Sequence, residues 1–166
     1  MKVRAYVLVV AVVLLTVSAG TKNAKPTEGI NPGDFAPRIE SLGNGNHFSF
    51  QNHSGRYTLL NFWAAYDGES RARNVRLWNE VKKLGSDKID MCSFSFDEKK
   101  SIFTETVKAD KLDETKQFHE GLARQSTLFG KYKLQKGFRN FLIDDRGVIV
   151  AINVTPDQLA DVLKKI

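Results

Sequence analysis

The segment YTLLNFW, at residues 57–63, restricts the fold of this chain more than any other feature. In a run this short, aromatic and branched side chains are typical of a strand buried in the middle of a sheet. Residues 67–84 follow with apolar side chains at helical spacing, and Gly85 marks the predicted end of that helix. A second apolar run, KIDMCSFSF at residues 88–96, comes next. A strand, a helix and a strand in this order indicate an α/β domain.

The alternation of helices and strands continues after residue 96. Residues 99–109 predict a second helix, and residues 113–134 are expected to be helical in parts. Two short strands are predicted at residues 141–144 and 148–152, joined by the turn sequence DRG. The dipeptide Thr-Pro at residues 155–156 then starts a last helix, with Thr as N-cap and Pro in the first turn. This order predicts a central mixed β-sheet with helices on both faces.

A β-hairpin is predicted before the first buried strand. Two short segments of alternating apolar residues, 39–42 and 47–51, flank the turn sequence GNGN at residues 43–46. The chain has 166 residues, a length that suits one domain, and its sequence contains no internal repeat. We therefore expect a single domain over residues 33–166.

Composition excludes several other classes of protein. The chain is 42% hydrophobic with 12 Gly and 4 Pro, too few for a collagen-like or a Pro/Gly-rich disordered chain. Its one cysteine, Cys92, cannot form a disulfide within the chain, which excludes disulfide-stapled and cysteine-rich zinc modules. Because Cys92 lies inside the predicted strand 88–96, we expect it to be buried as a small apolar residue. A thiol sensor or an intermolecular disulfide is the functional alternative.

Residues 1–20 have the layout of a secretory signal peptide. Lys2 and Arg4 precede an apolar run, and the small residues VSA follow at a cleavage site. The run is shorter than the ~20 apolar residues of a spanning helix, so a retained anchor is the alternative. No cysteine follows the run to carry a lipid. We expect a signal peptide at 1–20, a linker at 21–32 and export to the periplasm.

The charge of the chain argues against a nucleic-acid partner. The full sequence has a net charge of +6, and without residues 1–20 it keeps 23 basic and 19 acidic residues, a net charge of +4. The sequence has no dense block of Lys and Arg interleaved with aromatic residues, the pattern typical of nucleic-acid binding. We therefore expect a mildly basic, solvated surface and no nucleic-acid partner.

Three motifs along the chain resemble those of one known family. They are GDFAP at residues 33–37, GRYTLLNFWAAY at 55–66 and FLIDDRGVI at 141–149. In this order they are similar to the TlpA-like and thiol-specific antioxidant (AhpC/TSA) proteins of the thioredoxin-like superfamily. The resemblance covers residues 30–166. It implies a thioredoxin-like fold, with a central mixed β-sheet flanked by helices and an N-terminal β-hairpin.

The residues that carry the chemistry of this family are replaced in this chain. The family pattern W-A-x-W-C-x-x-C-R aligns with WAAYDGESR at residues 63–71. Asp67 then stands where the family has its nucleophilic cysteine, Ser70 where it has the resolving cysteine, and Arg139 where it has a cis-proline. Thiol–disulfide exchange needs a thiolate that attacks and a second thiol that resolves the mixed disulfide. The resemblance therefore implies the fold without this reaction.

Asp67 and Arg139 lead to more specific hypotheses. Asp is a favourable N-cap residue, so Asp67 is expected to cap the helix 67–84, with a general base or metal ligand as the alternative. In the family the cis-proline loop packs against the first cysteine, so the resemblance implies an Asp67–Arg139 ion pair. An Arg139 directed to solvent is the alternative. A cis bond before a non-proline residue costs ~2.5–4 kcal/mol, so the Phe138–Arg139 bond is expected to be trans.

Three arginines, Arg71, Arg73 and Arg76, lie in the first turns of the same predicted helix. Together with Arg139 they are candidates for a patch that binds an anion or an acidic partner. Positive charge opposes the helix dipole at this end of a helix. A solvated face paired with neighbouring acidic side chains is therefore the alternative.

Three functions fit these residues. The first is an exported binding module with a degenerate active site, which holds an envelope protein, a peptide or an acidic ligand without a metal or cofactor. Its candidate surface residues are Trp63, Tyr66, Asp67, Ser70, Arg71 and Arg139. The second is a thiol-redox protein that acts through Cys92 or through the thiols of a partner. The third is a structural role in an envelope assembly.

Overall fold

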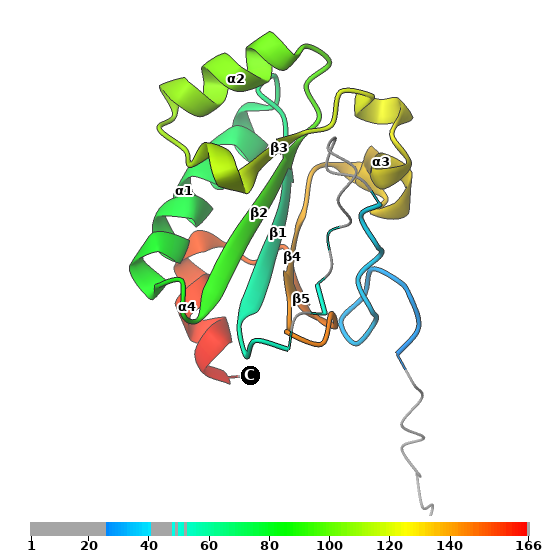
Figure 1. Ribbon diagram of the computed structural model, residues 1–166, viewed down its shortest axis with the longest axis vertical. Coiled ribbons are helices and arrows are strands. Elements are labelled where there is room, and N and C mark those ends of the chain that lie inside the picture. Colours follow the sequence, from blue (N-terminus) through cyan, green and yellow to red (C-terminus); the bar gives the residue numbers. More distant parts are fainter. Residues whose placement is uncertain (1–25, 41–47, 49, 52, 166) are drawn as a thin grey trace, which may run out of the picture.

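The computed structural model describes residues 26–40, 48, 50–51 and 53–165. It shows a mixed five-stranded sheet with helices on both faces (Figure 1). The strands are β1 (Tyr57–Trp63), β2 (Ile89–Ser95), β3 (Gln117–His119), β4 (Asn140–Ile143) and β5 (Ile149–Ile152). Across the sheet they follow the order β3-β2-β1-β4-β5. β1 is therefore central, parallel to β2 and antiparallel to β4.

The side chains of β1 explain its central place. Successive side chains of a strand point to opposite faces of the sheet. Leu59 packs in one core cluster with Leu77, whereas Leu60 and Phe62 pack in a second cluster on the other face. Apolar residues occupy both sets of positions, so the strand buries its side chains on both faces only when it lies between two layers of helices and loops.

The helices form these two layers. They are α1 (Gly68–Leu84), α2 (Lys100–Ala109), α3 (Thr127–Lys131) and α4 (Pro156–Lys165), with short 3-10 turns η1 (Glu114–Lys116), η2 (Ala123–Gln125) and η3 (Leu134–Lys136). α1 and α4 contact each other on one face of the sheet, and α3 lies with the segment 26–40 on the other (Figure 1). Within the described ranges, every helix is too short or too polar to cross a membrane.

Most of the predicted elements are confirmed to within a residue or two at their ends. The exception is the region 113–134, which was expected to be helical in parts and also contains β3. β3 pairs with β2 at the edge of the sheet, with Phe118 opposite Phe94. Because this pairing joins segments far apart in the chain, the local sequence of three residues does not indicate it.

The N-terminal region is only partly described. The expected signal peptide, 1–20, and the expected hairpin turn, 43–46, both lie outside the described residues. Of the hairpin the structure shows one antiparallel bridge, in which the Phe48 amide donates to the Ile39 carbonyl at 3.3 Å. Within the segment expected to be a linker, 21–32, the side chain of Ile30 is buried in the core.

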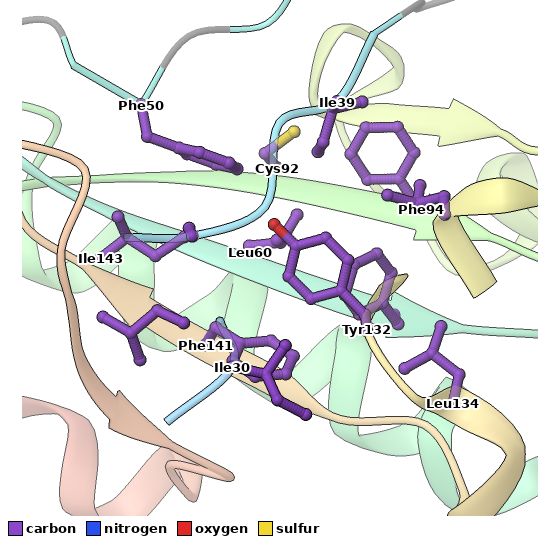
Figure 2. Packing of buried hydrophobic residues seen from close by; sticks show 14 of the residues in the cluster. Ile30, Ile39, Phe50, Leu60, Cys92, Phe94, Tyr132, Leu134, Phe141 and Ile143 are labelled. Carbon is purple, nitrogen blue, oxygen red and sulfur yellow. The ribbon is translucent and has the colours of Figure 1, made fainter. Parts of the chain in front are cut away.

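Cys92 lies in the larger core cluster, which Figure 2 shows together with Ile39 and Phe50. Its side chain is 3% exposed, so the prediction of a buried cysteine is confirmed. The same cluster holds Tyr132, whose hydroxyl donates to the Pro37 carbonyl at 2.7 Å and ties the N-terminal segment to the domain. This cluster covers the face of the sheet opposite α1, so the thiol and α1 lie on different sides of the sheet.

Candidate functional site

The start of α1 follows directly from the end of β1, and two polar side chains organise it. The Asp67 carboxylate accepts a hydrogen bond from the Ser70 amide at 2.8 Å. The Ser70 hydroxyl donates to the Asp67 carbonyl at 3.1 Å and accepts from the Ala64 amide at 3.3 Å. Asp67 is thus the N-cap of α1, as predicted, because its side chain satisfies one of the amides that a helix start leaves unpaired.

Removing this cap gives a direct measure of its role. We expect Asp67→Ala to lower the free energy of unfolding by about 0.5–2 kcal/mol, because the Ser70 amide loses its acceptor. Asp67→Asn keeps a capping oxygen and should be close to the wild type. Urea denaturation of the three proteins measures the difference, and equal losses in both variants would contradict a capping role.

The predicted ion pair between Asp67 and Arg139 is wrong. None of the ion pairs among the described residues joins these two side chains. The physical reason is that the Asp67 carboxylate bends back onto the first turn of α1, whereas Arg139 lies in a groove that faces the start of α4. The Phe138–Arg139 bond is trans, as predicted, and the Arg139 carbonyl accepts from the Phe62 amide at 3.0 Å.

The arginines of α1 have different environments. Arg71 makes a bidentate pair with Asp110, with nitrogen–oxygen distances of 2.8 and 2.7 Å, and this hydrogen-bonded pairing raises its pKa. Arg73 donates to the Phe138 carbonyl at 2.8 Å, and its nearest carboxylate, on Glu69, is 3.7 Å away. Burial is the main cause of the lowered pKa of Arg73. Arg71 therefore does not belong to the predicted patch with Arg73, since Asp110 already neutralises it.

A groove of about 550 Å³ is lined by the first turns of α1, the segment before β4 and the start of α4. Four basic side chains line it, and we call it the basic groove after them: Arg73, Arg76, Lys136 and Arg139. Two acidic side chains, Glu69 and Asp157, lie at the same groove. The structure thus brings three of the four predicted arginines together and adds Lys136, which the sequence analysis did not single out.

One wall of the basic groove is fixed by a buried side chain. Asn140 accepts from the Val154 amide at 2.8 Å and donates to the Val154 carbonyl at 3.0 Å. Both residues are buried. The loop between β5 and α4 is therefore held against β4 by a reciprocal pair of hydrogen bonds, which places the start of α4 next to Arg139.

Burial removes two residues from the predicted binding surface. Trp63 is 0% exposed and packs near Phe103, and Ser70 is 1% exposed. Neither side chain can contact a partner in this structure, because α1 and α2 cover Trp63 and Ser70 is buried in the first turn of α1. Tyr66, in contrast, is 60% exposed, with its ring 6.3 Å from that of Phe138 at the edge of the basic groove.

The remaining candidates for chemistry are the thiol and a metal site. Desolvation by burial raises the pKa of the Cys92 thiol, which disfavours the reactive thiolate form at neutral pH. Across the described part of the chain, no three His, Cys, Asp or Glu side chains are grouped closely enough to hold a metal ion. The start of α1 thus combines a capped helix with the neighbouring basic groove.

The architecture of this chain is similar to that of several solved structures. No protein-family model and no curated protein matches the chain. Among solved structures, a thioredoxin-like protein from Parabacteroides distasonis is 66% identical, with a TM-score of 0.79, over 84% of this chain and 99% of that one. Two further structures share the fold. A thiol-disulfide oxidoreductase from Bacteroides fragilis is 24% identical, with a TM-score of 0.60, over 83% of this chain and 98% of that one. A thiol:disulfide interchange protein from Bacteroides sp. is 21% identical, with a TM-score of 0.65, over 86% of this chain and 91% of that one. The chain belongs to the thioredoxin-like proteins.

Proposed function

We propose that this protein is an exported thioredoxin-like binding module that does not exchange disulfides. The observation that carries the proposal is the state of its cysteine: the sequence has one, Cys92, and it is buried on the face of the sheet opposite α1. At the start of α1, where the family resemblance puts the reactive pair, Asp67 and Ser70 stand instead. A carboxylate and an alcohol can neither form nor resolve a mixed disulfide.

The surface that remains at this end of the molecule suits binding. Tyr66 offers an exposed aromatic ring, and the basic groove beside it offers arginine side chains, the residue types most enriched at binding hot spots. Export to the periplasm is part of the proposal and is supported by the signal-peptide pattern of residues 1–20. We propose that an acidic ligand or an acidic segment of an envelope protein occupies this surface.

Redox activity through Cys92 is the rival function, and it gives a sharp test. We expect the wild-type protein not to accelerate the reduction of insulin by dithiothreitol. We also expect the native thiol to react with a disulfide reagent far more slowly than the thiol of the unfolded chain, because burial raises its pKa and blocks access. The chain unfolded in guanidinium should react at once.

The variant Cys92→Ala serves as the control, since it has no thiol at all. Wild type and Cys92→Ala should be indistinguishable in the insulin assay. Turnover by the wild type that disappears in Cys92→Ala would overturn the proposal in favour of a thiol-redox protein. Rapid labelling of the native thiol at neutral pH would contradict the burial argument independently.

A further inference from the structure

We infer that the basic groove binds a phosphate group, either as free inorganic phosphate or as a small phosphomonoester. The inference rests on the proposed function, because it names the ligand chemistry of the same surface. Three observations carry it: the charge of the groove, the environment of Arg73, and the fixed wall opposite Arg139.

The charges of the groove match a dianion. Four basic side chains and two acidic ones line it, which leaves an excess of two positive charges. A phosphate monoester carries about −1.5 to −2 charges at neutral pH, whereas a single carboxylate carries one. The amide dipoles at the start of α4, which begins at Pro156, add partial positive charge at the same place.

Among the described residues, the positive charge of Arg73 is only weakly compensated. Its side chain is largely buried, yet the Glu69 carboxylate opposite it lies 3.7 Å away and is 88% exposed. Arg71, two residues earlier, has a close bidentate partner in Asp110. Burial removes part of the hydration of a guanidinium group. When no carboxylate pairs closely with it, a bound anion lowers its free energy by supplying charged hydrogen bonds in place of water.

The frame that carries Arg73 and Arg139 is fixed by hydrogen bonds. Arg73 is anchored by its hydrogen bond to the Phe138 carbonyl, and Arg139 follows Phe138 directly and precedes the first residue of β4. Across the groove, the hydrogen bonds between Asn140 and Val154 fix the loop that leads into α4. Planar guanidinium groups held on a fixed frame can donate paired hydrogen bonds to phosphate oxygens, which favours them over flexible lysines for this ligand.

Isothermal titration calorimetry at low ionic strength tests the inference. The titrants are inorganic phosphate, phenyl phosphate and succinate, a dicarboxylate control. We expect both phosphates to bind and succinate to bind at least about tenfold more weakly, a difference of 1.4 kcal/mol. Tighter binding of phenyl phosphate would identify a phosphomonoester as the ligand, and equal or weaker binding would identify free phosphate.

Two variants locate the binding site. In Arg76→Gln/Arg139→Gln we expect the dissociation constant for phosphate to rise at least about tenfold, since each substitution removes a positive charge and its charge-assisted hydrogen bonds to phosphate. Arg124→Gln removes an exposed arginine outside the groove and should leave the constant unchanged. Thermal unfolding checks that both variants are folded, and an unfolded double variant is replaced by Arg76→Gln alone.

Several results would overturn the inference. They are no heat of binding with either phosphate, preferential binding of succinate, or equal affinities in the double variant and in Arg124→Gln. The insulin assay tests the proposed non-redox function separately. Reduction of insulin would contradict that function, whereas a lack of phosphate binding would contradict only the phosphate inference. Absence of both activities would leave the non-redox function intact and reject the phosphate ligand.

Discussion

Asn140→Ala is expected to lower the free energy of unfolding by about 2–5 kcal/mol. The side chain is fully buried and makes two hydrogen bonds to the backbone of Val154, at 2.8 and 3.0 Å. Its removal leaves a buried amide and a buried carbonyl of Val154 without partners, and each such group costs about 1–3 kcal/mol.

Urea denaturation measures this effect, with two comparison variants. Asn140→Asp keeps an acceptor for the Val154 amide but loses the donor to its carbonyl, so it should also be destabilised. Asn79→Ala changes an exposed position of α1 and should shift the free energy by no more than about 0.5 kcal/mol. If Asn140→Ala were as stable as Asn79→Ala, the reciprocal hydrogen bonds would contribute nothing to the fold.

The same substitution links stability to the basic groove. Asn140 holds the loop that faces Arg139, so its loss should weaken phosphate binding even where Arg76 and Arg139 are untouched. The expected direction is a higher dissociation constant in the folded fraction of Asn140→Ala. Phosphate should also raise the melting temperature of the wild type more than that of the variant, because a ligand stabilises the state that binds it.

The elements that the sequence predicted well are those with local signals. β1 is a continuous apolar run, and α1 has a capping residue at its start and Gly85 at its end, so neighbouring residues alone specify both. β3 has no such signal. Its three residues become a strand only because β2 supplies hydrogen-bond partners from more than twenty positions earlier in the chain.

The site was predicted less well than the fold, again for physical reasons. The cap by Asp67 depends on residues three positions apart and was predicted correctly. The partner of Arg71 is Asp110, 39 positions away, and no periodicity in the sequence points to it. Trp63 was expected on the binding surface, but both faces of β1 are covered, and Phe103 of α2 packs near Trp63. The environments of Arg71 and Trp63 therefore depend on packing and on partners far away in the chain, which the residue types alone do not indicate.

The proposed loss of a thiol pair at the start of α1 suggests a variant that should gain a reaction. We expect Asp67→Cys/Ser70→Cys, made together with Cys92→Ala, to catalyse the reduction of insulin by dithiothreitol, whereas the wild type does not. The carboxylate of residue 67 already reaches the amide of residue 70, and the Ser70 hydroxyl lies 3.1 Å from the Asp67 carbonyl. Each side chain thus reaches the backbone of the other residue within the first turn of α1, so we expect two thiols at these positions to form a disulfide.

The scaffold supplies the other requirements of the reaction. A thiolate at residue 67 would sit at the helix start, whose free amides lower the pKa of a cysteine. Residue 67 is partly exposed and can attack a substrate disulfide, while residue 70 is buried beside it and can resolve the mixed disulfide. The cost is the loss of the cap, about 0.5–2 kcal/mol, which a folded domain of this size can tolerate.

The two single variants separate this prediction from a general effect of adding thiols. Asp67→Cys alone, in the Cys92→Ala background, should form a mixed disulfide with a small disulfide reagent but should not turn over. Ser70→Cys alone should be slow to react, because its position is 1% exposed. A double variant no faster than either single variant would show that the start of α1 does not hold two thiols in a reactive geometry.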